Sequence, residues 1–432
     1  MIPGLVGWSG PPRVTQWNPP NEVSGLITMK FDMQGRLLFL RAVPTQVEAG
    51  GPNLEPDWNL LFAEAGLDKN RFAPAGPKWL PPESFDQRAD WEGQAAEQPD
   101  LTLHVTAAAC HGAPVYFQVI TPWDQPWRTS AATQSGISAK ISTAVWASVY
   151  AGYLAVGVFF ARRNMRRGRG DTRGALRLAA FTSLVYCAWG VMYFRSVPRS
   201  DYVLLQLLLL GIPLLFGMLT WIGYMAVEPY ARRSWPTLMI SWQRILNGSF
   251  RDPLVGRDVL YGGLAGSVTG AIVLGVAALT DPNMVSASFG RGLRASIGLT
   301  FSVLSGSCVT GLLYLGILTI VTGILRRRWL GIVATGLVMV GAYGASMRAL
   351  DLSMAVLTVL VFLAVLSRVG LIAGVSYSIF IWHLVASPPL DVNQWYAGLA
   401  AVPLVVLLAL LVLGFYVSLA GQPIFGSALK EE

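Results

Sequence analysis

The run ISTAVWASVYAGYLAVGVFFA, residues 141–161, decides the fold class, because it is an uncharged segment of the length that crosses a bilayer. A helix needs about 20 apolar residues to span a hydrocarbon core of about 30 Å. Eight further apolar runs follow. All nine lie near residues 141–161, 174–194, 202–227, 259–280, 300–325, 329–347, 350–367, 369–387 and 398–420. They predict a mainly α membrane protein, with a polytopic bundle of about nine transmembrane helices over residues 136–432.

The composition agrees with lipid as the solvent. Hydrophobic residues make up 53% of the chain and charged residues 13%, whereas an ordinary soluble domain carries roughly 25% charged residues. Residues 1–130 hold nine Lys and Arg against fourteen Asp and Glu, and the remainder holds twenty-three against ten. The net charge of +8 is therefore the sum of −5 from residues 1–130 and +13 from the membrane part. Basic cytoplasmic loops explain this positive charge. We therefore exclude nucleic acid as a partner.

Residues 1–135 differ in composition and predict a small α+β domain. Segments 26–32 and 36–44 flank Gly35, and segments 101–109 and 114–120 flank His111-Gly112, so each pair predicts a β-hairpin. Between the pairs, residues 57–65 predict a short helix that Gly66 ends, with Leu60, Leu61 and Ala65 on one face. The expected order is strand pair, helix, strand pair.

Arginine placement predicts the orientation of the chain in the membrane. If the first loop is cytoplasmic, seventeen Lys and Arg of the membrane part lie inside and six lie outside, namely Lys140, Arg195, Arg199, Arg291, Arg294 and Arg348. Cytoplasmic loops carry the excess of positive charge in membrane proteins. We therefore expect an extracytoplasmic N-terminal domain and a cytoplasmic C-terminus. The segment at the start has no signal-peptide pattern, so we expect either an upstream exporting segment or a first span that acts as a reverse signal anchor.

Residues 224–262 form the most informative predicted cytoplasmic loop. An apolar stripe at helical spacing predicts a short helix in the membrane interface near residues 235–247, with Ser241, Gln243 and Arg244 facing water or headgroups. Pro236 suits its first turn, and Asn247-Gly248 suits its C-terminal cap. The helix is either a brace on the membrane surface or a relay of motion to a cytoplasmic partner. The stripe consists of Trp235, Leu238, Met239, Trp242, Ile245 and Leu246.

Two other patterns have ordinary explanations in membrane proteins. The cytoplasmic loop after the first span contains a dense basic run, which suits orientation of the chain and can also attract anionic lipid. Glycines at 262, 266 and 270 give the small-residue spacing that lets helices pack closely. The basic loop residues are Arg162, Arg163, Arg166, Arg167, Arg169 and Arg173.

Candidate catalytic groups are few. His383 is the main ionisable residue within a predicted span, and we interpret it as a hydrogen-bonded interfacial histidine rather than part of a proton pathway. Glu228, at the inner end of the third span, is expected to pair with Arg232 or Arg233. His104 and His111 are too weak a basis for a zinc site, and no metalloprotease, CxxC or nucleophile-elbow motif occurs in the sequence. The sequence predicts no catalytic, cofactor or metal residue.

Four segments carry a resemblance to a known family: FDMQGRLLFLRAVP (31–44), WLPPESFDQRADWEG (79–93), AACHGAPVYFQVITPW (108–123) and MAVEPYARRSWPTLMISWQRILNGSFRDPLVGRDVL (225–260). They resemble the C-terminal extracytoplasmic and multi-span region of bacterial, acidobacterial-type serine/threonine protein kinases. The resemblance implies location in the bacterial inner membrane and a kinase domain attached in cis or acting in trans. The kinase's own Gly-rich loop, β3 lysine, HRD and DFG motifs do not occur in this sequence, so phosphoryl transfer is carried over to no residue.

Together these patterns predict a non-catalytic membrane sensor or signalling module whose partners are the bilayer and a kinase domain. A multi-pass transporter or permease, with a pathway among the Gly-rich helices of residues 259–347, is the alternative. The scarcity of charged residues within the spans argues against it. Internal repeats or a deep cavity between those helices would favour it.

Overall fold

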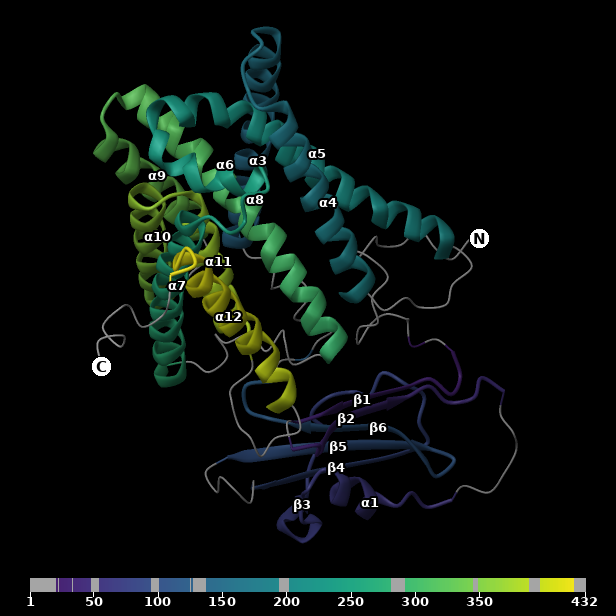
Figure 1. The fold of residues 1–432 in the computed structure, drawn as a ribbon. Coiled ribbons are helices and arrows are strands. Elements are labelled where there is room, and N and C mark those ends of the chain that lie inside the picture. The colour runs from purple at the N-terminus through teal and green to yellow at the C-terminus, as the bar shows by residue number, and fades with distance from the viewer. Residues whose placement is uncertain are drawn as a thin grey trace, which may run out of the picture. The chain divides into compact units, whose positions relative to one another are not determined.

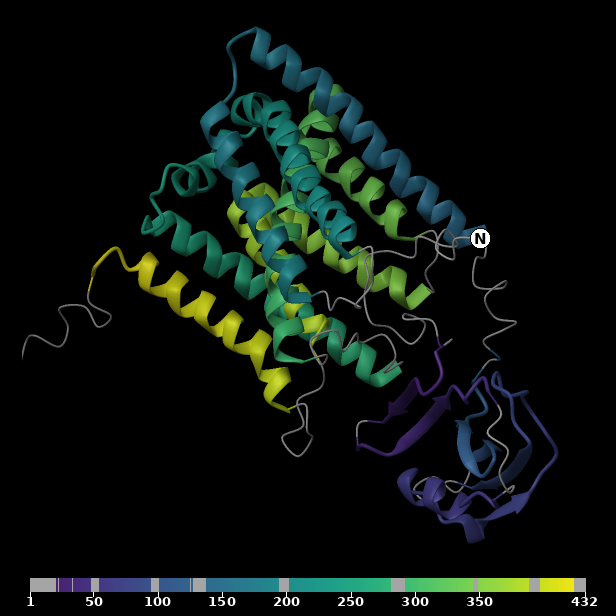
Figure 2. The same ribbon diagram turned by 90° about the vertical axis from the view of Figure 1, so that its right-hand side faces the viewer.

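A computed structural model of the chain describes residues 21–94 except 22, 33 and 48–53, and residues 101–124, 126, 137–193, 202–280, 292–344, 349–387 and 397–422. The chain divides near residue 135 into two compact units, a small unit built on a β-sheet and a larger helical unit (Figures 1 and 2). Five of the cations used to predict orientation lie outside the described residues: Arg195, Arg199, Arg291, Arg348 and Lys430.

The first unit contains a six-stranded antiparallel sheet in the order β1-β2-β6-β5-β4-β3. Its strands are β1 (Ile27–Phe31), β2 (Leu37–Ala42), β3 (Phe72–Pro74), β4 (Gln87–Gln94), β5 (Thr102–Cys110) and β6 (Ala113–Ile120). Both predicted hairpins are confirmed. At the β5–β6 turn, His111 and Gly112 have φ of 52° and 79°, which suits the two-residue turn with positive φ that closes twisted hairpins.

The predicted short helix is confirmed as α1 (Trp58–Glu64), with the Asp57 side chain accepting hydrogen bonds from two backbone N–H groups of its first turn. Its buried face was predicted wrongly in one place. Leu61 and Ala65 are buried, but Leu60 is 57% exposed and Phe62 faces the sheet instead. The Phe62 ring lies 5.2 Å from that of Trp91 and 5.4 Å from that of Phe72, centroid to centroid. These aromatic contacts form the centre of the core of the unit.

The second unit consists of helices that lie side by side (Figures 1 and 2). Each of the nine predicted apolar segments contains a helix of 15 to 33 residues, and a short 3₁₀ helix η2 and the short helix α6 follow the third. The helices are α3 (Ile137–Arg166), α4 (Thr172–Tyr193), α5 (Tyr202–Ser234), η2 (Pro236–Met239), α6 (Ile240–Leu246), α7 (Pro253–Thr280), α8 (Leu293–Leu325), α9 (Arg328–Gly344), α10 (Ala349–Arg368), α11 (Leu371–Val385) and α12 (Ala397–Ser418).

Among the described residues, five helical segments are long and apolar enough to cross a membrane. They are Thr172–Tyr193, Leu210–Ser234, Pro253–Ala277, Leu293–Leu325 and Ala397–Ser418. Shorter apolar helices occur at Arg328–Gly341, Leu352–Arg368 and Leu371–Val385. The chain is therefore a multi-pass helical membrane protein that also carries a small N-terminal sheet.

The helix α11 lies at the centre of the helical unit. It is 15 residues long, and twelve of these are buried, because α7, α8, α10, α12 and α6 all pack against it. A helix of this length extends only about 22 Å, less than a hydrocarbon core of about 30 Å. Protein side chains rather than lipid therefore surround most of its surface, and α11 positions the features described below.

Candidate functional site

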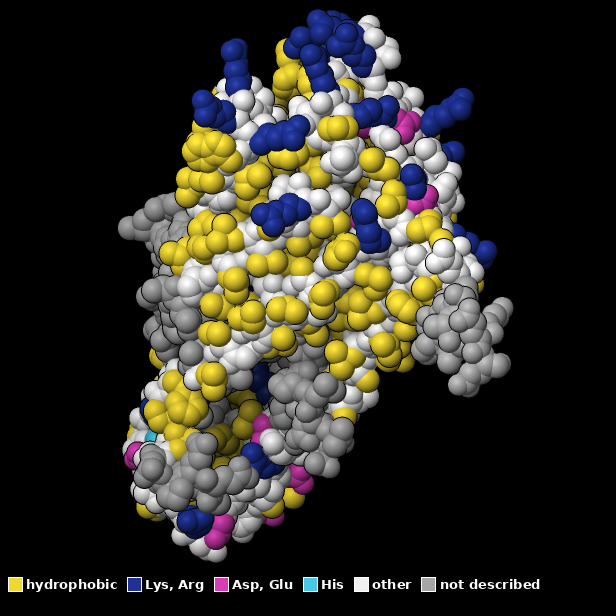
Figure 3. All heavy atoms as spheres, turned by 60° about the vertical axis from the view of Figure 1, so that its left-hand side comes forward, with side chains coloured by type: hydrophobic (Ala, Val, Ile, Leu, Met, Phe, Trp, Pro, Cys, Tyr) yellow, Lys and Arg dark blue, Asp and Glu magenta, His cyan; other side chains and the backbone are white. Residues whose placement is uncertain are grey.

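Exposed arginines gather at one end of the helical unit (Figure 3). The six arginines of the predicted basic loop are all exposed, at the end of α3 and the start of α4. Arg232 and Arg233 at the end of α5, Arg326 to Arg328 between α8 and α9, and Arg368 at the end of α10 are exposed as well. We call this the basic end. A broad band of hydrophobic side chains adjoins it on the face drawn in Figure 3.

The basic end carries a compact element, η2 together with α6, which we call the cap (residues 235–247). The apolar stripe predicted for it faces the protein. Trp235, Leu238, Met239 and Trp242 are 6%, 1%, 1% and 4% exposed, and Ile245 and Leu246 pack against the same core. Pro236 stands at the start of η2, and Asn247 forms the C-cap of α6, as predicted. The depth of the cap in a bilayer stays a prediction.

Neighbouring helices hold the cap at its N-terminal end. The guanidinium of Arg328 lies 4.9 Å from the centroid of the Trp235 ring, and its Nη2 donates to the Ser234 carbonyl at 3.2 Å. Gly370, between α10 and α11, has a φ of +145° and lies against Leu238, where an added Cβ would be 3.1 Å from the Leu238 carbonyl oxygen. Only glycine combines this φ with so close an approach of the cap.

A buried acid joins the cap to α7. Asp258 is 1% exposed; it accepts a hydrogen bond from the Ser241 hydroxyl and forms an ion pair with Arg257. The prediction that Ser241 faces water or headgroups was wrong, because Ser241 is 3% exposed and serves this buried carboxylate. No short sequence motif links the two residues, which are 17 positions apart, so the pair could not be found by spacing.

A second buried acid lies in the last turns of α5. Glu228 is 2% exposed and forms an ion pair with Arg232, one of its two predicted partners. Nearby, the Asn164 amide of α3 donates to the backbone oxygen of Met225 at 2.9 Å. Both buried carboxylates of this end are thus paired with arginines, so they stabilise the arrangement of the helices and do not resemble an unpaired general acid or base.

The three predicted packing glycines lie along the contact between α7 and α11. A Cβ added to Gly266 would be 2.6 Å from the Tyr377 carbonyl oxygen, and one added to Gly270 would be 3.0 Å from Leu384. At Gly262 an added Cβ would overlap the carbonyl oxygen of Ala373. The missing side chains let the backbones of the two helices approach closely.

His383 lies inside the helical unit, where it is 0% exposed. Its Nδ1 is 2.8 Å from the carbonyl oxygen of Ile379, one turn earlier in α11, and its Nε2 is 3.4 Å from the Thr300 hydroxyl of α8. It is hydrogen-bonded, as predicted, but buried between helices rather than at a surface. Its neighbour Trp382 is 55% exposed.

A cavity of about 470 Å³ lies among α7, α8, α9, α10 and α11. Its lining is mostly aliphatic and aromatic, with polar groups from Thr310, Thr358, Tyr377 and Ser378. The Tyr377 hydroxyl donates to the Thr358 carbonyl at 3.1 Å. Small-molecule sites have this size and this mixture of apolar walls with a few polar groups.

The first unit contains a buried polar network that the sequence reading missed. Asp90 on β4 accepts hydrogen bonds from Arg88 Nε at 2.7 Å, from the Thr106 hydroxyl at 2.7 Å and from His104 Nε2 at 3.2 Å. Burial raises the pKa of Asp90, but these hydrogen bonds and the positive charge of Arg88 outweigh it, so the pKa lies below its ordinary value. His104 is therefore a partner of Asp90 and lies apart from His111.

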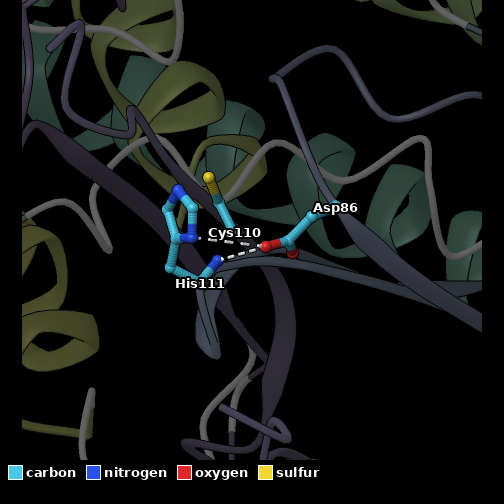
Figure 4. Close-up of side chains that lie close together, drawn as sticks. All are labelled: Asp86, Cys110 and His111. Carbon is cyan, nitrogen blue, oxygen red and sulfur yellow. Dashed lines mark hydrogen bonds and ion pairs between the residues drawn. The ribbon is translucent and has the colours of Figure 1, made fainter. Parts of the chain in front are cut away.

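At the β5–β6 turn, Asp86, Cys110 and His111 lie together (Figure 4). One possible ligand atom from each falls within 4.8 Å of the others. However, Asp86 Oδ2 already accepts the backbone N–H of His111 at 2.7 Å, and structural zinc sites have four ligands. Among the described residues only these three gather here, so we interpret the group as a brace of the turn.

The chain has no match among protein-family models, curated proteins or solved structures.

Proposed function

We propose that this chain is a non-catalytic sensor or signalling module of a bacterial inner membrane. In this proposal the nine helices α3–α5 and α7–α12 make up the membrane bundle, the α+β unit is extracytoplasmic, and the basic end and the C-terminus are cytoplasmic. The stimulus acts on the α+β unit or on the helices, and the cap transmits the resulting movement to a cytoplasmic partner. The multi-pass character of the chain does not depend on this proposal.

The single observation that carries this proposal is the number of helices that meet at the cap. The cap packs against α4, α5, α7, α10 and α11, and Arg328 of α9 lies over its Trp235 ring. A packed core transmits displacement because it does not deform continuously. A shift of any of these helices therefore shifts the cap. Its outer face carries exposed groups such as Ile240, 42% exposed, that a partner can contact.

The proposed partner is a serine/threonine kinase domain, joined in cis or acting in trans. This part of the proposal rests on the resemblance described above. The exposed arginines beside the cap would favour a partner with an acidic surface, because complementary charge raises the rate and specificity of association.

The sensor role is tested in the native host. The chromosomal gene is replaced by the full-length sequence, by a variant lacking residues 21–124, or by the Trp242→Ala variant of the cap, and membrane insertion of each is verified. We expect both altered forms to change the phosphorylation of cytoplasmic proteins under envelope stress relative to the full-length form. Phosphoproteomes that are identical in all three strains would overturn the proposal.

Orientation is tested separately with a membrane-impermeant maleimide on intact cells. The three native cysteines are first replaced by serine, and single cysteines are placed at the exposed position Arg167 and at Lys69, which is partly exposed. We expect Lys69→Cys to react in intact cells and Arg167→Cys to react only after lysis. The opposite pattern would place the α+β unit in the cytoplasm.

A transporter is the second candidate, and the cavity among α7 to α11 is the observation that favours it. A transport pathway must open to water, whereas a cavity sealed by lipid and protein stays dry. We expect Thr310→Cys and Ser378→Cys to resist a charged, water-soluble thiosulfonate added to either side of proteoliposomes. Rapid labelling from one side in one condition and from the other side in another would favour a transporter.

A further inference from the structure

A second hollow, distinct from the cavity described above, lies beneath the cap. This cap groove has a volume of about 590 Å³, within the range of about 300–1,000 Å³ that is typical of ligand sites. Its lining comes from α4, α6 and the turn that follows, α7, α8, α11 and α12. Most of the walls are aliphatic or aromatic; Phe181, Leu304, Ile379 and Leu410 are examples.

The cap groove starts at the basic end and extends into the apolar part of the unit. On α11 the lining residues recur at Ile372, Val375, Ser376 and Ile379, which is a length of about 10 Å along the helix axis. On α4 the lining passes from Arg177 to Phe181, one turn further from the basic end. The Ser376 hydroxyl donates to the Val259 carbonyl at 2.9 Å, so this wall offers little to a polar ligand.

The polar groups that line the cap groove lie where the groove meets the basic end of the helical unit. Arg177 Nη1 donates to the Leu246 carbonyl at the end of α6, at 2.7 Å. This bond uses one of the five N–H donors of the guanidinium and holds it beside the groove. No carboxylate of the described residues forms an ion pair with Arg177. Asn247 and Gly248, in the turn after α6, line the same end, and Asn247 is exposed.

We propose that the cap groove binds an anionic glycerophospholipid from the bilayer. The phosphate lies against Arg177 and the Asn247 amide, and one acyl chain extends along Phe181, Leu304 and Ile379. A guanidinium suits phosphate because its planar fork of donors matches the phosphate oxygens. Basic pockets between membrane helices bind the headgroups of anionic lipids in this way.

Charge and polarity select this occupant over others. A soluble anion would satisfy Arg177 but would leave the apolar walls exposed. An uncharged apolar molecule would fill the walls but would leave the guanidinium without an anion. A phospholipid satisfies both ends, and the cap groove runs from Arg177 and Asn247 at the basic end to apolar residues of the membrane helices, where lipid is abundant. The exposed Phe250, 63% exposed in the turn after α6, adds an apolar contact at the mouth of the groove.

The lipid would also stabilise the cap. Its headgroup contacts the end of α6 and its chain contacts α11, so the bound lipid joins the cap to the central helix of the unit. This inference needs only that the helical unit lies in a membrane. It holds in either orientation of the chain, and its failure would leave the sensor proposal intact.

The test uses the full chain in detergent, with native mass spectrometry to count bound lipids. The probes are dioleoyl phosphatidylglycerol, dioleoyl phosphatidylcholine and glycerol 3-phosphate. Arg177→Gln keeps a hydrogen-bond donor and removes the charge, and Leu304→Trp fills the groove and keeps the charge. Arg162→Gln is the matched control, because Arg162 is an exposed arginine of the basic end that does not line the groove.

We expect one tightly bound phosphatidylglycerol per chain, weaker phosphatidylcholine, and no competition by glycerol 3-phosphate. Loss of one lipid-facing basic group corresponds to about 1 kcal/mol, so Arg177→Gln should raise the dissociation constant about fivefold. Leu304→Trp should abolish the tight site, and Arg162→Gln should leave it unchanged.

Three results would overturn the inference. An equal loss for Arg177→Gln and Arg162→Gln would show diffuse attraction to the basic end. Unchanged binding by Leu304→Trp would place the lipid elsewhere. Competition by glycerol 3-phosphate would identify a soluble anion as the ligand. Since the two groove variants alter opposite ends of the site, the failure of one to fold leaves the other as the test.

Discussion

The guanidinium of Arg328 lies 4.9 Å from the centre of the Trp235 ring and joins the start of α9 to the start of the cap. The same side chain donates to the Ser234 carbonyl, so it contacts both the ring and the backbone that leads into the cap. Arg327 is also exposed and immediately precedes it, but no ring contact of this kind involves Arg327 among the described residues.

We predict that Arg328→Ala loosens the cap. An exposed cation–π contact is worth about 0.5–1 kcal/mol, so hydrogen exchange at residues 238–246 should be about two to five times faster if exchange follows local opening. The measurement is exchange mass spectrometry on the full chain in nanodiscs, with Arg327→Ala as the control. Equal exchange in both variants would mean that the Arg328 contact does not hold the cap.

Glycine positions on α7 give a second prediction with its own control. Gly266→Ala should destabilise the helical unit by about 1–3 kcal/mol, because the new Cβ would be 2.6 Å from the Tyr377 carbonyl oxygen and the helices would have to separate. An added Cβ at Gly275, on the same helix, meets nothing within 4 Å. Gly275→Ala should therefore be neutral or stabilise by up to about 1 kcal/mol. Thermal unfolding of the detergent-solubilised chain measures both, and equal midpoints would contradict the packing argument.

The length of the apolar runs predicted the helices of the membrane part, where lipid is the solvent. The run 141–161 and its eight counterparts each coincide largely with one helix, because a helix satisfies its own backbone hydrogen bonds in lipid. The strand β4 was missed because its sequence, QRADWEGQ, is poor in strand-forming residues. It forms because β5 pairs along its whole length and because Asp90 is satisfied by Arg88, Thr106 and His104.

The candidate site was predictable as a pattern but not as a set of contacts. The spacing from Trp235 to Leu246 identified the helical stripe of the cap, yet a stripe does not tell whether protein or lipid covers it. The partners are residues from distant helices, such as Arg328 and Gly370. Spacing along the chain likewise does not link Ser241 to Asp258, or Arg177 to the end of α6, since those contacts depend on how the helices pack.

Asp90 makes the stability of the sheet depend on pH. Its pKa in the folded state lies below the ordinary value of about 3.9, so the unfolded state binds the proton first as the pH falls. Asp90 therefore contributes stability that is complete above about pH 4–5 and is lost as the pH falls through the folded pKa.

We predict that Asp90→Asn weakens the sheet at neutral pH and reduces its loss of stability below about pH 4. Hydrogen exchange of β4 and β5 across this pH range, corrected for intrinsic rates, measures both effects. Glu92→Gln is the control, because Glu92 lies on the same strand and is exposed. A pH dependence unchanged by Asp90→Asn would show that another carboxylate controls it.

The group formed by Asp86, Cys110 and His111 allows a test of whether it braces the turn or binds a metal. As a brace, Asp86 accepts the backbone N–H of His111 in a turn where His111 has a positive φ, so Asp86→Ala should lower the unfolding free energy by about 1 kcal/mol. Asp86→Asn keeps an acceptor oxygen and should cost less. Because a bound metal stabilises only the folded state, zinc and chelator both test the alternative. We expect neither to shift the melting temperature of the full chain, whereas a rise with zinc that Cys110→Ser abolishes would identify a metal site.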